Sequence, residues 1–124
     1  MNSTTLNKER NRKRKYLERY KKLMERSIFL DNDIHSIKSV DHNHIKTTAK
    51  GKSLTDKMHE LDKVCEDMAN IENAIESIGN LRLQTVLGYR YLLFKRTEEI
   101  AEIMHYCDTT IKRDINKALD RLDI

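Results

Sequence analysis

Apolar residues recur with helical spacing on two short segments near the C-terminal end of the sequence, within residues 97–122. In the first segment, Ile100, Ala101 and Met104 fall at i, i+1 and i+4 and share one helix face. The second segment carries a longer stripe, formed by Ile111, Ile115, Ala118, Leu119 and Leu122. The pattern predicts helices over residues 98–105 and 108–122. Two such helices joined by a very short turn are typical of a helix-turn-helix.

Capping residues stand at the start of both predicted helices. Thr97 is expected to be the N-cap of the first, because its hydroxyl can accept a hydrogen bond from an orphan backbone N–H. Glu98 and Glu99 suit the positive end of the helix dipole. Cys107 occupies the N-cap position of the second helix, and Asp108 is the alternative cap, which would move the helix start by one residue.

The face opposite the second apolar stripe is polar and basic. An ordinary solvated helix alternates acids and bases in i,i+4 pairs, whereas this face carries no acid and Asp114 lies to one side. Arg, Lys and Asn side chains can bond to base edges in the major groove. We therefore expect the face to bind double-stranded DNA through Thr109, Thr110, Lys112, Arg113, Asn116 and Lys117. The alternative is a helical hairpin with a solvated charged face.

The front half of the chain carries heptad spacing. The first seam is Tyr16, Tyr20, Leu23, Ser27, Leu30, Ile34 and Ile37, and the second is Met58, Leu61, Cys65, Met68 and Ile75, with Ile71 beside it. Two such helices joined by a loop over residues 41–53 predict an antiparallel hairpin. Leu17, Met24 and Ile28 widen the first stripe, which favours pairing with a second copy of the chain. The residues expected to serve oligomerisation are Tyr20, Leu23, Leu30, Ile34, Leu61, Met68 and Ile75.

The helix between the hairpin and the helix-turn-helix is predicted over residues 81–94. Ser53 or Thr55 can cap the helix before it, Gly79 suits a left-handed end of that helix, and Asn80 can cap the new one. Its inner stripe is Leu83, Val86, Leu87, Tyr91 and Phe94.

Composition and charge narrow the class of protein. The chain has 124 residues, no Pro and three Gly, with 35% charged residues, which favours an all-helical protein. Residues 1–26 hold ten Lys or Arg and three Glu, whereas residues 54–80 hold two Lys and seven acids. A basic N-terminal arm can contact phosphates. The phosphate-contact candidates are Arg10, Arg12, Lys13, Arg14, Lys15, Lys95 and Arg96.

Other classes of site find little support. The sequence lacks an apolar run long enough to span a membrane and the apolar core of a signal peptide. Cys65 and Cys107 have no CxxC partner, which favours two reduced thiols and a cytoplasmic location. His35, His42 and His44 lack further ligands at zinc-like spacing, so neither a metal nor another cofactor is expected. There is also no glycine-rich phosphate loop, HExxH motif or nucleophile with an evident base, so the protein is not expected to be an enzyme.

The C-terminal segment resembles the helix-turn-helix that ends bacterial housekeeping sigma factors. It resembles still more closely small phage and prophage regulators of Gram-positive hosts, of the ArpU and RinA type. The matching motifs are Arg90-Tyr91, Thr97-Glu98-Glu99-Ile100-Ala101, His105-Tyr106-Cys107 and Ala118-Leu119. Two positions depart from the pattern: His105 replaces a turn glycine and Cys107 replaces a serine. By this resemblance, Arg90 would be a structural ion-pair residue.

The sequence therefore predicts an all-α protein with a long N-terminal helical hairpin, coiled-coil-like, followed by a C-terminal three-helix helix-turn-helix module. The expected parts are a basic, partly disordered arm (1–15), an oligomerisation hairpin (16–79) and a DNA-binding module (80–124). The resemblance implies a sequence-specific transcriptional regulator of a phage or mobile element, acting as a homo-oligomer, most simply a dimer. The alternatives are a sigma-like factor that docks on host RNA polymerase and a DNA-packaging or assembly protein whose helix-turn-helix is a scaffold.

Overall fold

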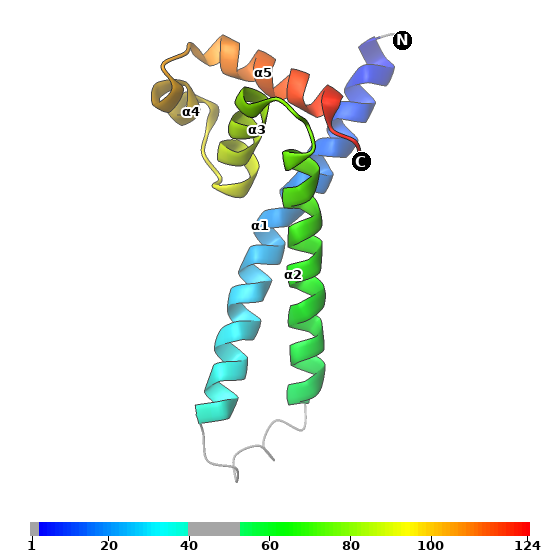
Figure 1. Cartoon of the computed structure of the whole chain (residues 1–124), viewed down its shortest axis with the longest axis vertical. Helices are drawn as coiled ribbons and strands as arrows, with labels where there is room; N and C mark the ends of the chain where they lie inside the picture. Colours follow the sequence, from blue (N-terminus) through cyan, green and yellow to red (C-terminus); the bar gives the residue numbers. More distant parts are fainter. Residues whose placement is uncertain (1–2, 40–52) are drawn as a thin grey trace. The chain divides into compact units, whose positions relative to one another are not determined.

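The computed structural model describes residues 3–39 and 53–124, and this part of the chain is helical (Figure 1). Two long helices pack as a hairpin, and three shorter C-terminal helices pack together, so the all-α prediction is confirmed. The elements are α1 (Ser3–Ser39), α2 (Leu54–Glu76), α3 (Leu81–Leu87), the π-helix η2 (Gly88–Leu92), α4 (Thr97–Met104) and α5 (Asp108–Arg121). Apart from Ser53, the predicted loop at 41–53, with His42 and His44, lies outside the described residues.

The chain divides into two compact units. One contains Lys22–Ala69, and the other contains the chain up to Lys21 together with Asn70–Ile124. The second unit is larger than the DNA-binding module expected at 80–124, because it includes the start of α1 and the end of α2.

The unit formed by Lys22–Ala69 pairs α1 with α2 through a narrow apolar seam. Leu30, Ile34 and Val64 are buried. Charged side chains bridge the two helices at its edges. Arg26 donates two hydrogen bonds of 3.0 Å to the Glu60 carboxylate, and the Lys57 ammonium lies 2.6 Å from the Asp33 carboxylate.

The predicted seam of α2 is wrong by one residue at two positions. Val64 is buried where Cys65 was expected, and Met58 is 41% exposed. The stripe that faces inward is Leu61, Val64, Met68, Ile71 and Ile75, which keeps alternating steps of three and four. Because one residue turns the helix by about 100°, the shift leaves Met58 and Cys65 on the outside.

The segment expected to be a partly disordered arm is helical from Ser3 onward. It forms the first turns of α1 and belongs to the unit that holds α3, α4 and α5. Leu17 is fully buried in this unit, and Tyr20 is 7% exposed. Leu17 is therefore a core residue of its own chain and cannot be a residue left over for pairing with a second copy.

Three predicted caps are confirmed. The Ser53 hydroxyl accepts from the Asp56 N–H at 3.2 Å, so Ser53 and not Thr55 caps α2. Gly79 has φ +79°, the left-handed conformation expected after the end of α2. Asn80 caps α3, with its side-chain oxygen 3.1 Å from the Leu83 N–H.

The helix predicted over 81–94 is shorter and is not uniformly α-helical. After α3 the chain widens into η2, where the Leu93 N–H bonds to the Gly88 carbonyl at 3.0 Å. Phe94 then adopts φ +59°, which ends the helical path. The inner stripe was predicted correctly for Leu83, Val86, Leu87 and Tyr91, which are all buried. Within the described part of the chain, no helix is long and apolar enough to cross a membrane.

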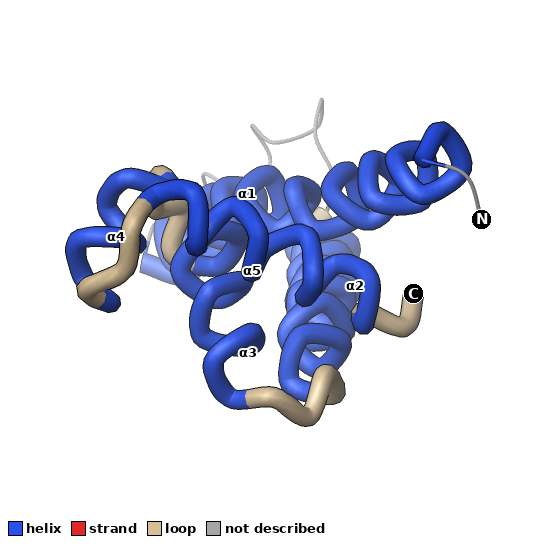
Figure 2. Tube along the Cα trace, turned by 90° about the horizontal axis from the view of Figure 1, so that it is seen from above, coloured by secondary structure: helices blue, strands red, loops and turns tan. Residues whose placement is uncertain are grey.

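Helices α4 and α5 form the predicted helix-turn-helix, joined by residues 105–107, and they pack with α3 (Figure 2). His105 has φ +61° and ψ +40°, the left-handed conformation that a turn glycine would adopt more easily. The Tyr106 N–H bonds to the Ala101 carbonyl at 2.9 Å and closes this end of α4.

The first prediction concerns this turn. His105→Gly is expected to raise the free energy of unfolding by about 1 kcal/mol, since it removes the steric cost of a left-handed residue. Glu102→Gly is the matched control: it lies exposed inside α4 and should lower stability by about 1 kcal/mol. Chemical denaturation followed by circular dichroism measures both. Equal destabilisation by the two substitutions would contradict the strain at His105.

Candidate nucleic-acid interface

Helix α5 buries one face and presents the other to solvent. Its buried residues are Ile111, Asp114, Ile115, Ala118 and Leu119. Of the six residues expected to bind DNA, four are exposed: Thr109, Lys112, Arg113 and Lys117. Thr110 and Asn116 are half-buried and already have side-chain partners. The exposed positions concentrate the candidate interface on the first two and a half turns of α5.

The start of α5 is held by short-range polar contacts. Cys107 keeps the N-cap position, with extended backbone angles, so Asp108 does not displace it. The Cys107 sulfur lies 3.0 Å from the Thr110 hydroxyl. This hydrogen bond, followed by those from backbone N–H groups of the helix start, lowers the pKa of the Cys107 thiol. The Asp108 carboxylate accepts from Lys112 at 3.0 Å, which lowers the pKa of Asp108 and raises that of Lys112.

The start of α4 differs by one residue from the prediction. Arg96 is the N-cap, and Thr97 is already helical. The Arg96 carbonyl accepts the first helical hydrogen bond, from the Ile100 N–H at 3.0 Å. The Glu99 carboxylate reaches back to the Arg96 N–H at 3.2 Å, which lowers the pKa of Glu99. This reciprocal bond from Glu99 fixes the helix start without the Thr97 hydroxyl.

An ion pair between an exposed arginine and a buried carboxylate joins the middle of α5 to α3. Asp114 is only 5% exposed, and its carboxylate lies 2.7 Å from a terminal guanidinium nitrogen of Arg82. The Arg82 guanidinium also stacks on the Tyr106 ring at 4.2 Å from its centroid. In the sequence, Asp114 falls between Ile111 and Ala118 on the apolar stripe of α5. This position could have predicted a buried carboxylate paired with a cation. The structural ion pair is therefore Arg82–Asp114. Arg90, expected by resemblance to form one, has no carboxylate partner among the described residues.

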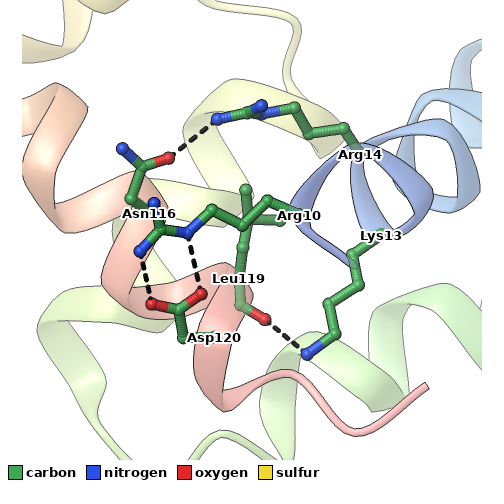
Figure 3. A network of polar contacts seen from close by, with 6 residues as sticks. All are labelled: Arg10, Lys13, Arg14, Asn116, Leu119 and Asp120. Atoms are coloured by element: carbon green, nitrogen blue, oxygen red, sulfur yellow. Dashed lines mark hydrogen bonds and ion pairs between the residues drawn. The ribbon is translucent and has the colours of Figure 1, made fainter. Parts of the chain in front are cut away.

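The first turns of α1 pack against the second half of α5 (Figure 3). Arg10 donates two hydrogen bonds to the Asp120 carboxylate, at 2.8 and 2.7 Å. Lys13 donates to the Leu119 carbonyl at 2.9 Å. Arg14 donates to the Asn116 side-chain oxygen at 2.7 Å. These contacts join residues more than a hundred positions apart in the sequence, and the sequence pattern did not predict them.

The outer face of α5 is not free of acid, contrary to the expectation from the sequence. Asp120 is exposed one turn beyond Asn116. The double hydrogen bond from Arg10 balances its charge and lowers the pKa of Asp120. Arg10 therefore compensates the negative charge of Asp120 at this end of α5.

The phosphate-contact candidates separate into two groups. Arg10, Lys13 and Arg14 are engaged with α5, and Arg12 bonds to Glu9 at 2.9 Å and to the Ile124 carbonyl at 2.8 Å. Lys15 and Arg96 are exposed and Lys95 is half-buried, with Arg96 3.4 Å from Glu99. Lys15 is the candidate of the basic arm that has no hydrogen-bond or ion-pair partner of any kind among the described residues.

The oligomerisation candidates are largely covered by their own chain. Tyr20, Leu30, Ile34 and Ile75 are buried, and Leu23, Leu61 and Met68 are half-buried. The side chain of Ile37 lies outside the described residues. Exposed apolar side chains of the Lys22–Ala69 unit are instead Ile28, Phe29 and Met58, at 54%, 57% and 41%.

In the described part of the chain, no three His, Cys, Asp or Glu side chains are grouped as metal ligands. Comparison of the chain with protein-family models, with curated proteins and with solved structures yields no match.

The second prediction tests the contact between α1 and α5 by a double-mutant cycle on Arg10→Ala and Asp120→Ala. We expect a coupling of about 0.5–1 kcal/mol at pH 7, since both side chains are partly exposed. The Asp120 pKa is lowered in the folded state. The coupling should therefore be complete above the ordinary carboxyl pKa, about 4, and should disappear as the pH falls through the lowered value.

The control cycle uses Arg12 and Glu9, an exposed i,i+3 pair on α1, for which a few tenths of a kcal/mol is expected. Urea unfolding curves from pH 2 to 7 measure both cycles. A coupling between Arg10 and Asp120 no larger than the control, or unchanged at pH 2, would contradict a stabilising contact.

Proposed function

We propose that the chain is a sequence-specific DNA-binding transcriptional regulator of the phage and prophage type that its C-terminal motifs resemble. The observation that carries the proposal is the exposed polar face at the start of α5, the second helix of a helix-turn-helix. Thr109, Lys112, Arg113 and Lys117 lie there, uncovered by their own chain. Arg113 and Lys117 have no carboxylate partner among the described residues, so their donors are available to base edges or phosphates.

Other observations support the same face as the one that enters the major groove. The two ties on α5, Arg82–Asp114 from α3 and the α1 contacts at Asn116 and Asp120, fix its middle and its end. Neither covers the first turns. In helix-turn-helix proteins the N-terminal residues of the second helix contact base edges. Base reading is therefore assigned to Thr109 and Arg113, with Lys112 and Lys117 beside them, whereas Asn116 is held by Arg14.

Two alternatives remain distinguishable by experiment. A sigma-like factor would bind DNA only together with RNA polymerase, and a packaging or assembly protein would form a ring of many subunits. A gel shift with the purified chain alone, on sequences selected from random DNA, separates these classes. Specific binding without polymerase supports the proposed regulator.

The third prediction concerns Arg113. Arg113→Ala is expected to weaken binding to the selected site by roughly 1–3 kcal/mol, with a much smaller effect on random duplex DNA. Arg121→Ala is the matched control, because it removes the same charge from the last turn of α5. Fluorescence anisotropy measures the affinity of each of the two variants for the selected site and for random duplex DNA, at two salt concentrations. Equal losses of affinity for selected and random DNA would show that Arg113 contacts a phosphate and does not read a base.

The proposal includes homo-oligomerisation, but through a different surface from the one that the sequence predicted. The Lys22–Ala69 unit is a two-helix hairpin with a narrow seam, and Ile28, Phe29 and Met58 remain exposed on it. A groove beside Ile28, lined by Leu61 and Cys65, adds to this surface. Burying these side chains against a second copy would remove their apolar area from water. It would also place two α5 helices on one DNA molecule, suited to a target of two half-sites.

The fourth prediction tests this surface. Ile28→Asp should reduce the oligomer to monomer without unfolding it, because Ile28 is exposed and its carboxylate variant stays hydrated in the monomer. Leu30→Asp would instead unfold the hairpin, since Leu30 is buried within it. Asn32→Asp supplies the same charge at an exposed control site on α1. Multi-angle light scattering at micromolar concentration measures the mass. A wild-type chain that is already monomeric contradicts the proposal.

A further inference from the structure

An open cavity of about 300 Å³ lies in the unit that holds the helix-turn-helix. Its walls come from the start of α1, from η2, from Thr97 at the start of α4, and from the middle of α5. The residues that matter for its chemistry are Arg14, Glu18, Arg90, Tyr91, Lys112 and Asn116. The cavity is not part of the base-reading face, although Lys112 and Asn116 border both.

The cavity carries positive charge that its own chain does not cancel. Arg14 donates to two neutral amide oxygens, those of Asn11 at 2.9 Å and Asn116 at 2.7 Å. Arg90 lies over the Tyr91 ring, 5.5 Å from its centroid, and has no carboxylate partner among the described residues. Lys112 is balanced by Asp108. Glu18 is the lining carboxylate and can balance one of the two guanidinium groups, so one positive charge is left over.

The hydrogen-bonding groups of the cavity are mostly donors. Arginine and lysine have no acceptor atom, so the Asn116 oxygen must face Arg14, which leaves the Asn116 NH₂ group to donate elsewhere. Burial raises the pKa of Tyr91, while Arg90 and Arg14 nearby act to lower it. The Tyr91 hydroxyl therefore stays protonated at neutral pH and can also donate. A ligand rich in acceptor oxygens satisfies this arrangement, and an uncharged or cationic ligand does not.

We propose that this cavity binds a phosphate group through Arg14, Arg90 and the Asn116 amide. The planar fork of a guanidinium matches two phosphate oxygens, and two such groups from different helices surround a tetrahedral anion better than a planar one. The phosphate can belong to the DNA backbone, a source that rests on the proposed function, or to a small phosphate-bearing molecule. In either case Arg14 would bond both to the phosphate and to Asn116 of α5. Phosphate in the cavity would therefore affect the hydrogen bond of the Asn116 side chain.

The test uses the whole chain and inorganic phosphate, with sodium chloride adjusted to constant ionic strength. NMR follows the guanidinium signals of Arg14 and Arg90 and the side-chain amide of Asn116. We expect these signals to shift saturably with phosphate in the wild-type protein. Arg90→Gln should weaken the affinity roughly tenfold, as expected for loss of charge-assisted hydrogen bonds. Arg121→Gln, which removes the same charge outside the cavity, should leave the affinity unchanged.

Arg90→Lys provides a second variant that keeps the charge without the fork, and it should fall between wild type and Arg90→Gln. Random duplex DNA is then added to the phosphate-loaded protein. Displacement of phosphate identifies the DNA backbone as the source, and retention identifies a small molecule. Signals that do not move, or that move equally in Arg90→Gln, would overturn the site even if duplex binding persists. Phosphate binding without any duplex binding would instead remove the proposed function and leave this site standing.

Discussion

The packing of the start of α1 against the end of α5 is the contact on which the unit with the helix-turn-helix depends. The three C-terminal α-helices are short, with 7, 8 and 14 residues, and short helices gain most of their stability from tertiary packing. The long helix α1 provides these short helices with a surface to pack against. Leu17 of α1 is fully buried in this unit, as is Leu119 of α5. Lys13 also donates to the Leu119 carbonyl, which accepts a second hydrogen bond from the N–H of Leu122, the C-cap residue of α5.

The second contact that holds α5, the ion pair between Arg82 and Asp114, differs from the first because its carboxylate is buried. Asp114 is buried, and removing Arg82 would leave its carboxylate uncompensated, which is far more costly than losing an exposed pair. Since Arg82 also stacks on Tyr106, the same guanidinium joins α3, the turn and α5. The two ties leave the first turns of α5 uncovered. The polar residues there therefore extend from a helix whose orientation is fixed by α3 on its buried face and by α1 at its C-terminal end.

The sequence predicted what depends on local spacing and failed where distant segments meet. The stripes of α4 and α5, the caps Ser53 and Asn80, and the left-handed residue Gly79 follow from periodicity and backbone preference. The α2 seam was misplaced because Val64 and Cys65 are neighbours that both fit a heptad, and only packing decides between them. The break of α3 into η2 has no strong marker besides Gly88. The partners of Arg10 and Arg14 could not be read from the sequence, since no local pattern specifies contacts between its two ends.

Most helical proteins have low contact order, and this property lets them fold fast. The unit that carries α5 nevertheless includes contacts of very high sequence separation, such as Arg10 with Asp120, which are 110 residues apart. During synthesis the basic turns of α1 leave the ribosome more than a hundred residues before their partners on α5. Until Asp120 has emerged, Arg10 lacks its carboxylate partner. Completion of this unit is therefore a late event, separate from local formation of each helix.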